Sequence, residues 1–92
     1  MGPTFEWDRR KDEENRRKHG VFFLEALSAF ADPLSVTIDD PDHSEGESRY
    51  ILLGQSDQNR LLVITHTDRN ECTRLISARE ATRQERRQYE QG

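Results

Sequence analysis

The residues of this sequence best suited to chemistry are arginines, which gather in its C-terminal half. Residues 49–92 carry eight arginines and no lysine, against six Asp and Glu residues. Arginine presents a planar fork of N–H donors that matches the oxygens of phosphate or carboxylate. The arginines that could share one surface are Arg69, Arg74, Arg79, Arg83, Arg86 and Arg87. They indicate either a stripe that follows a phosphate backbone or a charged helix face in solvent.

The spacing of these arginines divides them between two predicted elements. Arg74 and Arg79 flank residues 75–78, and their odd separation places them on opposite faces of a regular strand. From residue 79 onward the sequence has helical propensity. A helix there would put Arg79, Arg83 and Arg86 on one face.

Three other side chains could take part in a reaction. His66 ends a predicted strand, and its ordinary pKa of about 6.5 suits general acid–base chemistry. Ser77 on the next strand makes a Ser–His nucleophile pair conceivable, although a serine there more often packs or hydrogen-bonds locally. Cys72 has Arg74 nearby to favour a thiolate, but an unreactive thiol is the commoner case.

Motifs for other chemistry are absent from the sequence. It contains no glycine-rich phosphate loop, no G-x-S-x-G, no H-E-x-x-H and no paired C-x-x-C. The acidic segment 39–47 could hold Mg²⁺ or Ca²⁺, but its spacing fits no calcium loop, so a solvated loop is favoured. Its oxygen and nitrogen ligands would be Asp39, Asp40, Asp42, His43, Glu45 and Glu47. We therefore expect no metal and no other cofactor.

Elements that must position these residues can be read from the apolar pattern. Residues 4–7 predict a short strand or extended lead-in. Asp8 is a suitable N-cap for a helix over residues 9–19, which Gly20 would end. Apolar residues at i, i+3, i+4 and i+7 predict a second helix that ends before Pro33. These apolar positions are Phe23, Ala26, Leu27 and Phe30.

The apolar pattern predicts a sheet in the middle of the chain. Residues 34–38 alternate between apolar and polar types, as in a half-buried strand, and the continuous apolar run over residues 61–64 suggests a central strand covered on both faces. The expected strands cover residues 34–38, 49–54, 60–67 and 73–78, and turn-forming residues separate them. The sequence therefore predicts an α+β fold with two N-terminal helices, a four-stranded twisted antiparallel sheet and a C-terminal helix.

Length and composition restrict the class of protein. Ninety-two residues favour a single domain over residues 1–92. Hydrophobic residues make up 32% and charged residues 35%, against roughly 45–50% and 25% in typical domains. No apolar run approaches the roughly 20 residues that span a bilayer, no signal-peptide pattern opens the chain, and its one cysteine cannot form an internal disulfide. We expect a soluble, intracellular protein without a membrane partner.

Several short blocks, in their order and spacing, resemble the BrnT-type toxins, small ribonucleases of bacterial type II toxin–antitoxin operons. The blocks are Phe5-Glu6-Trp7-Asp8, Lys11, Asn15, Lys18-His19-Gly20-Val21, Phe30-Ala31-Asp32-Pro33, Glu47, Arg49, Tyr50, Gly54, Arg60-Leu61-Leu62-Val63, His66-Thr67, Ile76-Ser77-Ala78-Arg79, Arg83, Glu85-Arg86 and Tyr89. They extend from about residue 5 to residue 90. One departure is Phe22, where the family often has a small polar residue that can cap the second helix.

The resemblance implies a fold, an activity and a partner. The fold would be RelE-like, with a twisted antiparallel sheet and flanking helices. The protein would be a cytoplasmic toxin that cleaves RNA without a metal ion, halts translation and is neutralised by a cognate antitoxin. Two alternatives remain open, namely a non-enzymatic module whose arginine face docks an acidic protein, and an inactive toxin relic with the same fold.

Residue roles follow from the chemistry of metal-free RNA cleavage. The 2′-OH of RNA is the nucleophile, so the protein must help to deprotonate it, stabilise the phosphorane and protonate the leaving oxygen. We expect Arg79 and Arg83 to contact the phosphate and His66 to act as acid or base, although a structural histidine is an equal alternative. The residues expected to bind RNA are Lys18, His19, Arg74, Arg86 and Tyr89. For Tyr89, an anchoring role for the last helix is the favoured alternative.

Overall fold

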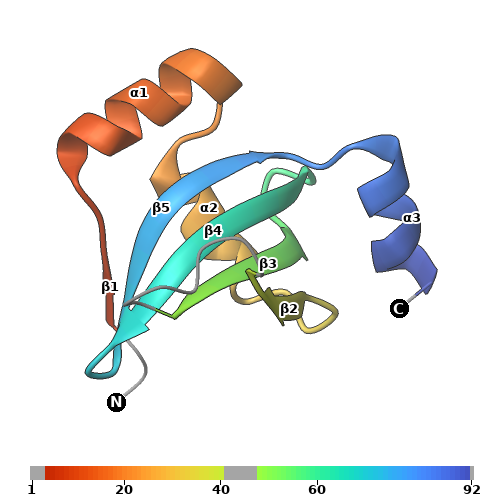
Figure 1. Cartoon of the computed structure of the whole chain (residues 1–92). Helices are drawn as coiled ribbons and strands as arrows, with labels where there is room; N and C mark the ends of the chain where they lie inside the picture. Colours follow the sequence, from red (N-terminus) through yellow and green to blue (C-terminus); the bar gives the residue numbers. More distant parts are fainter. Residues whose placement is uncertain (1–3, 41–47, 92) are drawn as a thin grey trace.

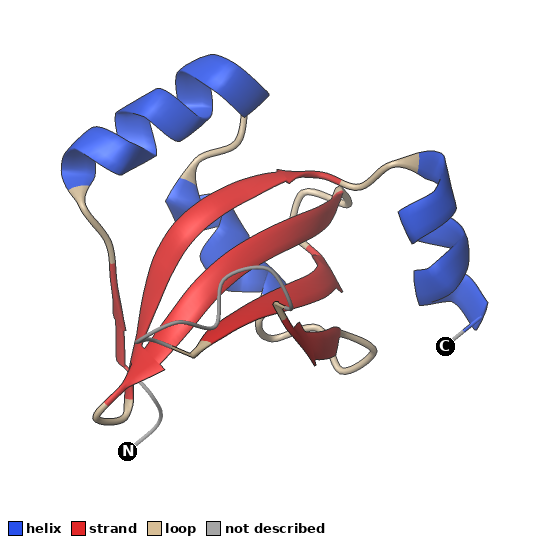
Figure 2. Cartoon of the chain, viewed as in Figure 1, coloured by secondary structure: helices blue, strands red, loops and turns tan. Residues whose placement is uncertain are grey.

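In the part of the chain that the structure describes, five strands form one mixed sheet with three helices around it (Figures 1 and 2). The computed structural model describes residues 4–40 and 48–91. In chain order the elements are β1 (Thr4–Glu6), α1 (Arg9–His19), α2 (Phe23–Ala29), β2 (Val36–Asp39), β3 (Arg49–Gln55), β4 (Leu61–Arg69), β5 (Cys72–Glu80) and α3 (Arg83–Gln91). In Figure 1, α1 lies beside β5, α2 lies behind the sheet and α3 follows the far end of β5. The predicted α+β class is confirmed.

The sheet has one strand more than the four predicted. Strands β2 to β5 form the expected antiparallel meander, and the sheet order is β1-β5-β4-β3-β2. Strand β1 pairs in parallel with β5, from Thr4 opposite Cys72 to Glu6 opposite Arg74. A local pattern of three residues cannot reveal a partner 68 positions away, so the sequence predicts either a short strand or an extended lead-in there.

Helix α1 has the predicted caps and is joined to the sheet by Asn15. The Asp8 side chain accepts a hydrogen bond from the Arg10 N–H at 2.8 Å, and Gly20 ends the helix in the left-handed conformation at φ 70°. Buried Asn15 donates to the carbonyls of Ala78 at 2.7 Å and Val21 at 2.9 Å. Its Oδ1 also accepts from the Ala78 N–H at 2.9 Å. One amide side chain therefore satisfies both backbone groups of Ala78 on β5.

Helix α2 begins without a cap from its own sequence. Phe22 occupies the N-cap position, where the side chain makes no capping hydrogen bond. Asp12 of α1 supplies the acceptor instead, since its Oδ1 takes the Phe23 N–H at 2.9 Å. The departure at Phe22 is thus compensated by a carboxylate from the neighbouring helix.

The core lies between the two N-terminal helices and one face of the sheet, called here the covered face. Its fully or nearly fully buried members are Val21, Phe23, Ala26, Ala29, Leu52, Leu62, Ile64, Leu75 and Ala78. Packing of α2 is close, because a Cβ at Gly54 would lie 2.8 Å from the Ala29 carbonyl oxygen. Buried Glu25 joins this layer to Arg60, which also contacts Glu80 at 2.9 Å.

The opposite face of the sheet, called the α3 face, is covered only in part. It carries Ile51, Leu53, Val63 and Arg79, with Val36 and Ile38 on the edge strand β2. Val36 is 41% exposed and Ile38 56% exposed. The alternation in residues 34–38 had predicted a half-buried strand. Val36–Asp39 are exposed because β2 lies at the sheet edge and none of the helices within residues 4–40 and 48–91 buries its apolar side.

Candidate active site

A β-bulge in β5 places two predicted site arginines on the same face. Arg79 pairs with Val63 and Arg74 pairs with Thr67, positions of β4 that point to one side of the sheet. The register shifts between them, because Ser77 pairs with Thr65 whereas Leu75 pairs with His66. The extra residue reverses the predicted opposite placement of Arg74 and Arg79. Both therefore lie on the α3 face.

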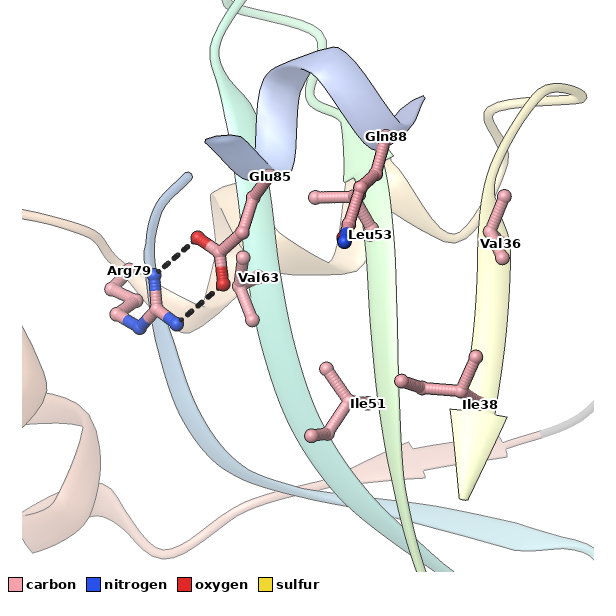
Figure 3. Close-up of a pocket in the computed structure, with 8 residues that line it drawn as sticks. All are labelled: Val36, Ile38, Ile51, Leu53, Val63, Arg79, Glu85 and Gln88. Carbon is pink, nitrogen blue, oxygen red and sulfur yellow. Dashed lines mark hydrogen bonds and ion pairs between the residues drawn. The ribbon is translucent and has the colours of Figure 1, made fainter. Parts of the chain in front are cut away.

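Arg79 is held by a carboxylate from α3 (Figure 3). Its Nη1 lies 2.8 Å and its Nη2 2.9 Å from the two carboxylate oxygens of Glu85, and Nη1 also donates to the Glu80 carbonyl at 3.2 Å. The hydrogen bond from Arg79 is the main reason why the pKa of Glu85 falls to about 2. The same pairing raises the pKa of Arg79. The guanidinium is thus fixed in orientation while its side chain stays 41% exposed.

Glu85 is itself positioned by the start of α3. It accepts from the Thr82 N–H at 2.8 Å, and its own N–H donates to the Thr82 hydroxyl at 3.2 Å. This reciprocal arrangement is a capping box, which fixes where a helix begins. Helix α3 therefore starts at Arg83, and the expectation of a helix from residue 79 is wrong. Arg79 belongs to β5, so it does not share a helical face with Arg83 and Arg86.

The contacts of Arg79 leave one edge of its guanidinium available. Arginine has five N–H donors, and three are taken up by Glu85 and the Glu80 carbonyl. No described residue accepts from the Nε–H or from the second Nη2–H. These two N–H groups lie on the same edge of the planar group, in the spacing that matches two oxygens of a phosphate.

A pocket of about 190 Å³ lies beside the Arg79–Glu85 pair. Figure 3 shows five apolar side chains of the sheet along it, with Glu85 and Gln88 reaching in from α3. These apolar residues are Val36, Ile38, Ile51, Leu53 and Val63. Helix α3 has no buried residue, so it stands above this face and does not fill it.

Tyr89 gives α3 its second attachment. Its hydroxyl donates to Asp32 Oδ2 at 2.5 Å, while Asp32 also accepts from the N–H groups of Leu34 and Gln55 at 2.9 and 2.8 Å. Burial raises the pKa of Asp32, but these three hydrogen bonds outweigh it and the net pKa lies below its usual range. The hydroxyl thus anchors α3 to the turn after α2, in agreement with the anchoring alternative.

The other two predicted residues of α3 are exposed. Glu85 and Gln88 of α3 face the sheet. Successive residues of an α-helix are about 100° apart, so Arg83 projects from the side opposite Glu85 and Arg86 projects laterally. Both side chains are exposed. Neither of them lines the pocket.

His66 lies in the core and not beside Arg79. It is 4% exposed, and its ring packs against Phe30 at 5.1 Å and stacks on Tyr50 at 5.6 Å between ring centroids. Burial lowers the pKa of its imidazole. Nδ1 is 3.4 Å from Asp68 Oδ1, without hydrogen-bond geometry to it or to another described group. Because His66 is on the covered face, it cannot reach a phosphate held by Arg79.

Lys18 and His19 lie at a separate place. They line a hollow between α1 and β5 that also includes Lys11, Glu14 and Ser77. The structure therefore divides the predicted site residues among the α3 face, the core and this hollow. Ser77 and His66 are not neighbours on one face, since Ser77 pairs with Thr65. This arrangement gives no support to the Ser–His pair.

Two residues that line these places are not among the predicted site residues. Glu85 could have been found from the sequence, because the Thr82-x-x-Glu85 spacing is typical of a capping box. Lys11 lies seven residues before Lys18 on the same helix face, a spacing that is also readable from the sequence. Among residues 4–40 and 48–91, no group of His, Cys, Asp and Glu could hold a metal ion. The candidate ligands Asp42, His43, Glu45 and Glu47 fall outside the described residues.

Comparisons with known proteins identify a family and a similar fold. The family model described as "Ribonuclease toxin, BrnT, of type II toxin-antitoxin system" matches residues 7–85. The fold is similar to the crystal structure of the Brucella abortus ribonuclease toxin BrnT, with a TM-score of 0.61 and 21% sequence identity. That match covers 88% of this chain and 99% of the Brucella chain. No curated protein matches the chain significantly. None of the helices in the described ranges is long and apolar enough to cross a membrane.

Proposed function

The chain belongs to the BrnT family of type II toxin–antitoxin ribonuclease toxins, and from this premise we propose that it cleaves RNA without a metal ion on the α3 face, at Arg79. RNA supplies its own nucleophile in the 2′-OH, so the protein's main task is to stabilise negative charge on the phosphorane. A rigidly held guanidinium is suited to that task, because its donors need no reorientation as the charge develops.

The observation that carries this proposal is the free edge of Arg79. Glu85 and the Glu80 carbonyl hold three of its N–H groups, and the Nε–H and second Nη2–H remain to take two phosphate oxygens. Glu85 is thus a positioning residue, and Arg79 is the group that touches the scissile phosphate. Arg74, on the same face, and Arg83 and Arg86, on α3, would contact neighbouring phosphates.

His66 and Tyr89 have structural roles in this proposal. Burial of the His66 ring between Phe30 and Tyr50 makes it a packing residue of the covered face. Tyr89 holds α3, and with it Glu85, over the sheet. Both residues support the site without contacting the phosphate.

The proposal extends to the partner and the setting of the reaction. The protein would act as one toxin domain in the cytoplasm, where cleavage of RNA halts translation. Its cognate antitoxin would inhibit by covering the α3 face, which presents exposed apolar residues next to Arg79. Bound antitoxin should therefore abolish RNA binding, and a complex that still cleaves RNA at the full rate would contradict inhibition by covering.

Cleavage of single-stranded RNA by the purified protein in EDTA tests the function. Arg79→Ala should lower kcat/KM by about 10²-fold or more, the usual effect of removing one donor to a developing oxyanion. Arg87→Ala is the matched control, because it removes an exposed arginine from α3 that has no proposed role. Equal losses in both variants would contradict the role of Arg79.

Failure of the wild type to cleave free RNA would divide the remaining hypotheses. Growth arrest on induced expression, lost in Arg79→Ala, would then indicate cleavage that needs the ribosome. An absence of growth arrest would favour the protein-docking module or the inactive relic.

A further inference from the structure

A polar hollow of about 220 Å³ lies between α1 and the bulged part of β5. Lys11, Lys18 and His19 line it from α1, together with Glu14, and Ser77 borders it from β5. One water takes up roughly 30 Å³ in the liquid, so the hollow has room for a phosphate group. It does not belong to the Arg79 pocket, with which it shares no residue.

The basic side chains of this hollow have no partners among the described residues. Neither Lys11, Lys18 nor His19 makes an ion pair or side-chain hydrogen bond there, whereas Arg60 and Arg79 are each paired with carboxylates. Two lysines face one carboxylate, Glu14, so the hollow is positive overall. Lysine ammonium groups are compact point charges that commonly bind phosphate.

The β-bulge opens the strand at this place. Ile76 has no Cα partner on β4, because Leu75 pairs with His66 and Ser77 with Thr65. A bulge bends its strand and redirects side chains, and bulges are common next to active sites. Here it brings Ile76 and Ser77 of β5 to the edge of the hollow, opposite the lysines of α1.

We propose that this hollow binds a second phosphate of the RNA, next to the one held at Arg79; this inference rests on the proposed function. Lys11 and Lys18 supply the charge, and His19 supplies a further side-chain nitrogen at the rim of the hollow. Ser77 and Arg79 are two residues apart on β5, so their Cα atoms are about 7 Å apart. One single strand can therefore reach both places by passing over β5.

The chemistry of the hollow favours RNA over an acidic protein as its ligand. Protein interfaces obtain most of their affinity from apolar or aromatic side chains buried in pockets. Apart from Ile76, the lining of this hollow is polar or charged. A small positive site without an apolar floor suits a single phosphate.

A pair of matched double variants tests the proposal. Lys11→Ala/Lys18→Ala removes the two cations of the hollow. Arg10→Ala/Arg17→Ala removes two exposed cations with the same seven-residue spacing on the same helix, and neither lines the hollow. Both pairs are made in the Arg79→Ala background to block cleavage, and melting temperatures verify folding. Binding of a fluorescent single-stranded RNA is then measured between 50 and 200 mM salt.

Loss of one phosphate contact should change the salt dependence in a defined way. The slope of log K against log salt should become shallower by about 0.7 in Lys11→Ala/Lys18→Ala, with affinity lower by about threefold or more. The slope in Arg10→Ala/Arg17→Ala should stay near that of the parent. Equal changes in both pairs, or no change in either, would overturn the proposal. Weaker antitoxin binding with unaltered RNA binding would overturn it in favour of an acidic protein.

Cleavage by the otherwise wild-type protein keeps this inference separate from the proposed function. If the wild-type protein cleaves RNA but Lys11→Ala/Lys18→Ala leaves the slope of log K against log salt unaltered, only the second phosphate site is refuted. A shallower slope without cleavage, in solution or in cells, would refute the ribonuclease function alone.

Discussion

The two faces of the sheet are stabilised in different ways. On the covered face, apolar side chains from α2, from Val21 before it and from the strands are buried together. Asn15 connects α1 to β5 from within, and Glu25 connects α2 to Ser56 and Arg60 between β3 and β4. On the α3 face, Val36 and Ile38 stay about half exposed, and α3 is attached through Arg79–Glu85 and Tyr89–Asp32. The difference indicates that the covered face supplies the stability of this small domain. The α3 face is then free to bind a substrate or a partner.

The strongest test of this comparison is to break the ion pair of the covered face. Arg60→Ala should lower the free energy of unfolding by about 3–5 kcal/mol, because it leaves the carboxylate of Glu25 buried without its partner. The Glu25 side chain is 3% exposed, and Arg60 contacts it through Nε at 2.9 Å and through Nη2. Urea denaturation at pH 7 measures the change.

The pH dependence of this variant has a defined sign. The hydrogen bond from Arg60 holds the pKa of Glu25 below its ordinary value. The pair therefore contributes its full stabilisation to the folded protein above that ordinary value, near pH 4.5. This stabilisation is lost as the pH falls through the lower pKa of Glu25 in the folded state. The deficit of Arg60→Ala should shrink in acid. A loss below 1 kcal/mol at neutral pH would show that the pair is not needed, and Glu25→Leu/Arg60→Met should recover part of the loss.

A smaller effect is expected at the amide that connects α1 to β5. Asn15→Ala should cost about 1–3 kcal/mol, because the N–H of Ala78 and the carbonyls of Ala78 and Val21 lose buried partners. The exposed Glu13→Ala on the same helix should change stability by less than about 0.5 kcal/mol. If thermal unfolding shows equal shifts for the two variants, the amide is not what joins helix and strand.

Local signals in the sequence predicted most of the covered face. Asp8 and Gly20 defined α1 because caps act within a few residues. The continuous apolar run over residues 61–64 predicted β4 as a central strand because it reflects burial on both sides. The two-residue period of a strand places His66 on the same side as Leu62 and Ile64, so its burial is readable from the sequence.

What the sequence did not predict depends on contacts between distant residues. The pairing of Glu6 with Arg74 in β1 and β5 crosses almost the whole chain. The bulge at Ile76 has no sequence signature here, yet it alone decides that Arg74 and Arg79 share a face. The candidate site therefore required the register of β5, which a single sequence does not contain.

On the α3 face, removing the charge of Glu85 should lower the free energy of unfolding only slightly, and the size of this loss should depend on pH. Glu85→Gln is expected to cost about 1 kcal/mol at pH 7, since the pair is partly exposed to solvent. The pKa of Glu85 falls to about 2 in the folded protein from an ordinary 4.5. The pair thus stabilises fully above pH 4.5 and loses its effect as the pH falls towards 2. The free energies of unfolding of the wild type and Glu85→Gln, measured by urea denaturation, should approach each other as the pH falls. A difference between them that stays constant from pH 7 to pH 3 would contradict this pairing.

The smallest effect should come from an Ile→Ala substitution on the α3 face, with the same substitution on the covered face as its control. Ile38→Ala on β2 is expected to change the free energy of unfolding by about 0.5 kcal/mol, because its side chain is 56% exposed and little burial is lost. Ile64→Ala on β4 removes the same atoms from a site with 0% exposure and should cost about 2–5 kcal/mol through the cavity that it leaves. If bound antitoxin covers the α3 face, Ile38→Ala should weaken the complex although it scarcely affects the free toxin. Equal losses of stability for the two variants would show that the α3 face is as much a part of the core as the covered face.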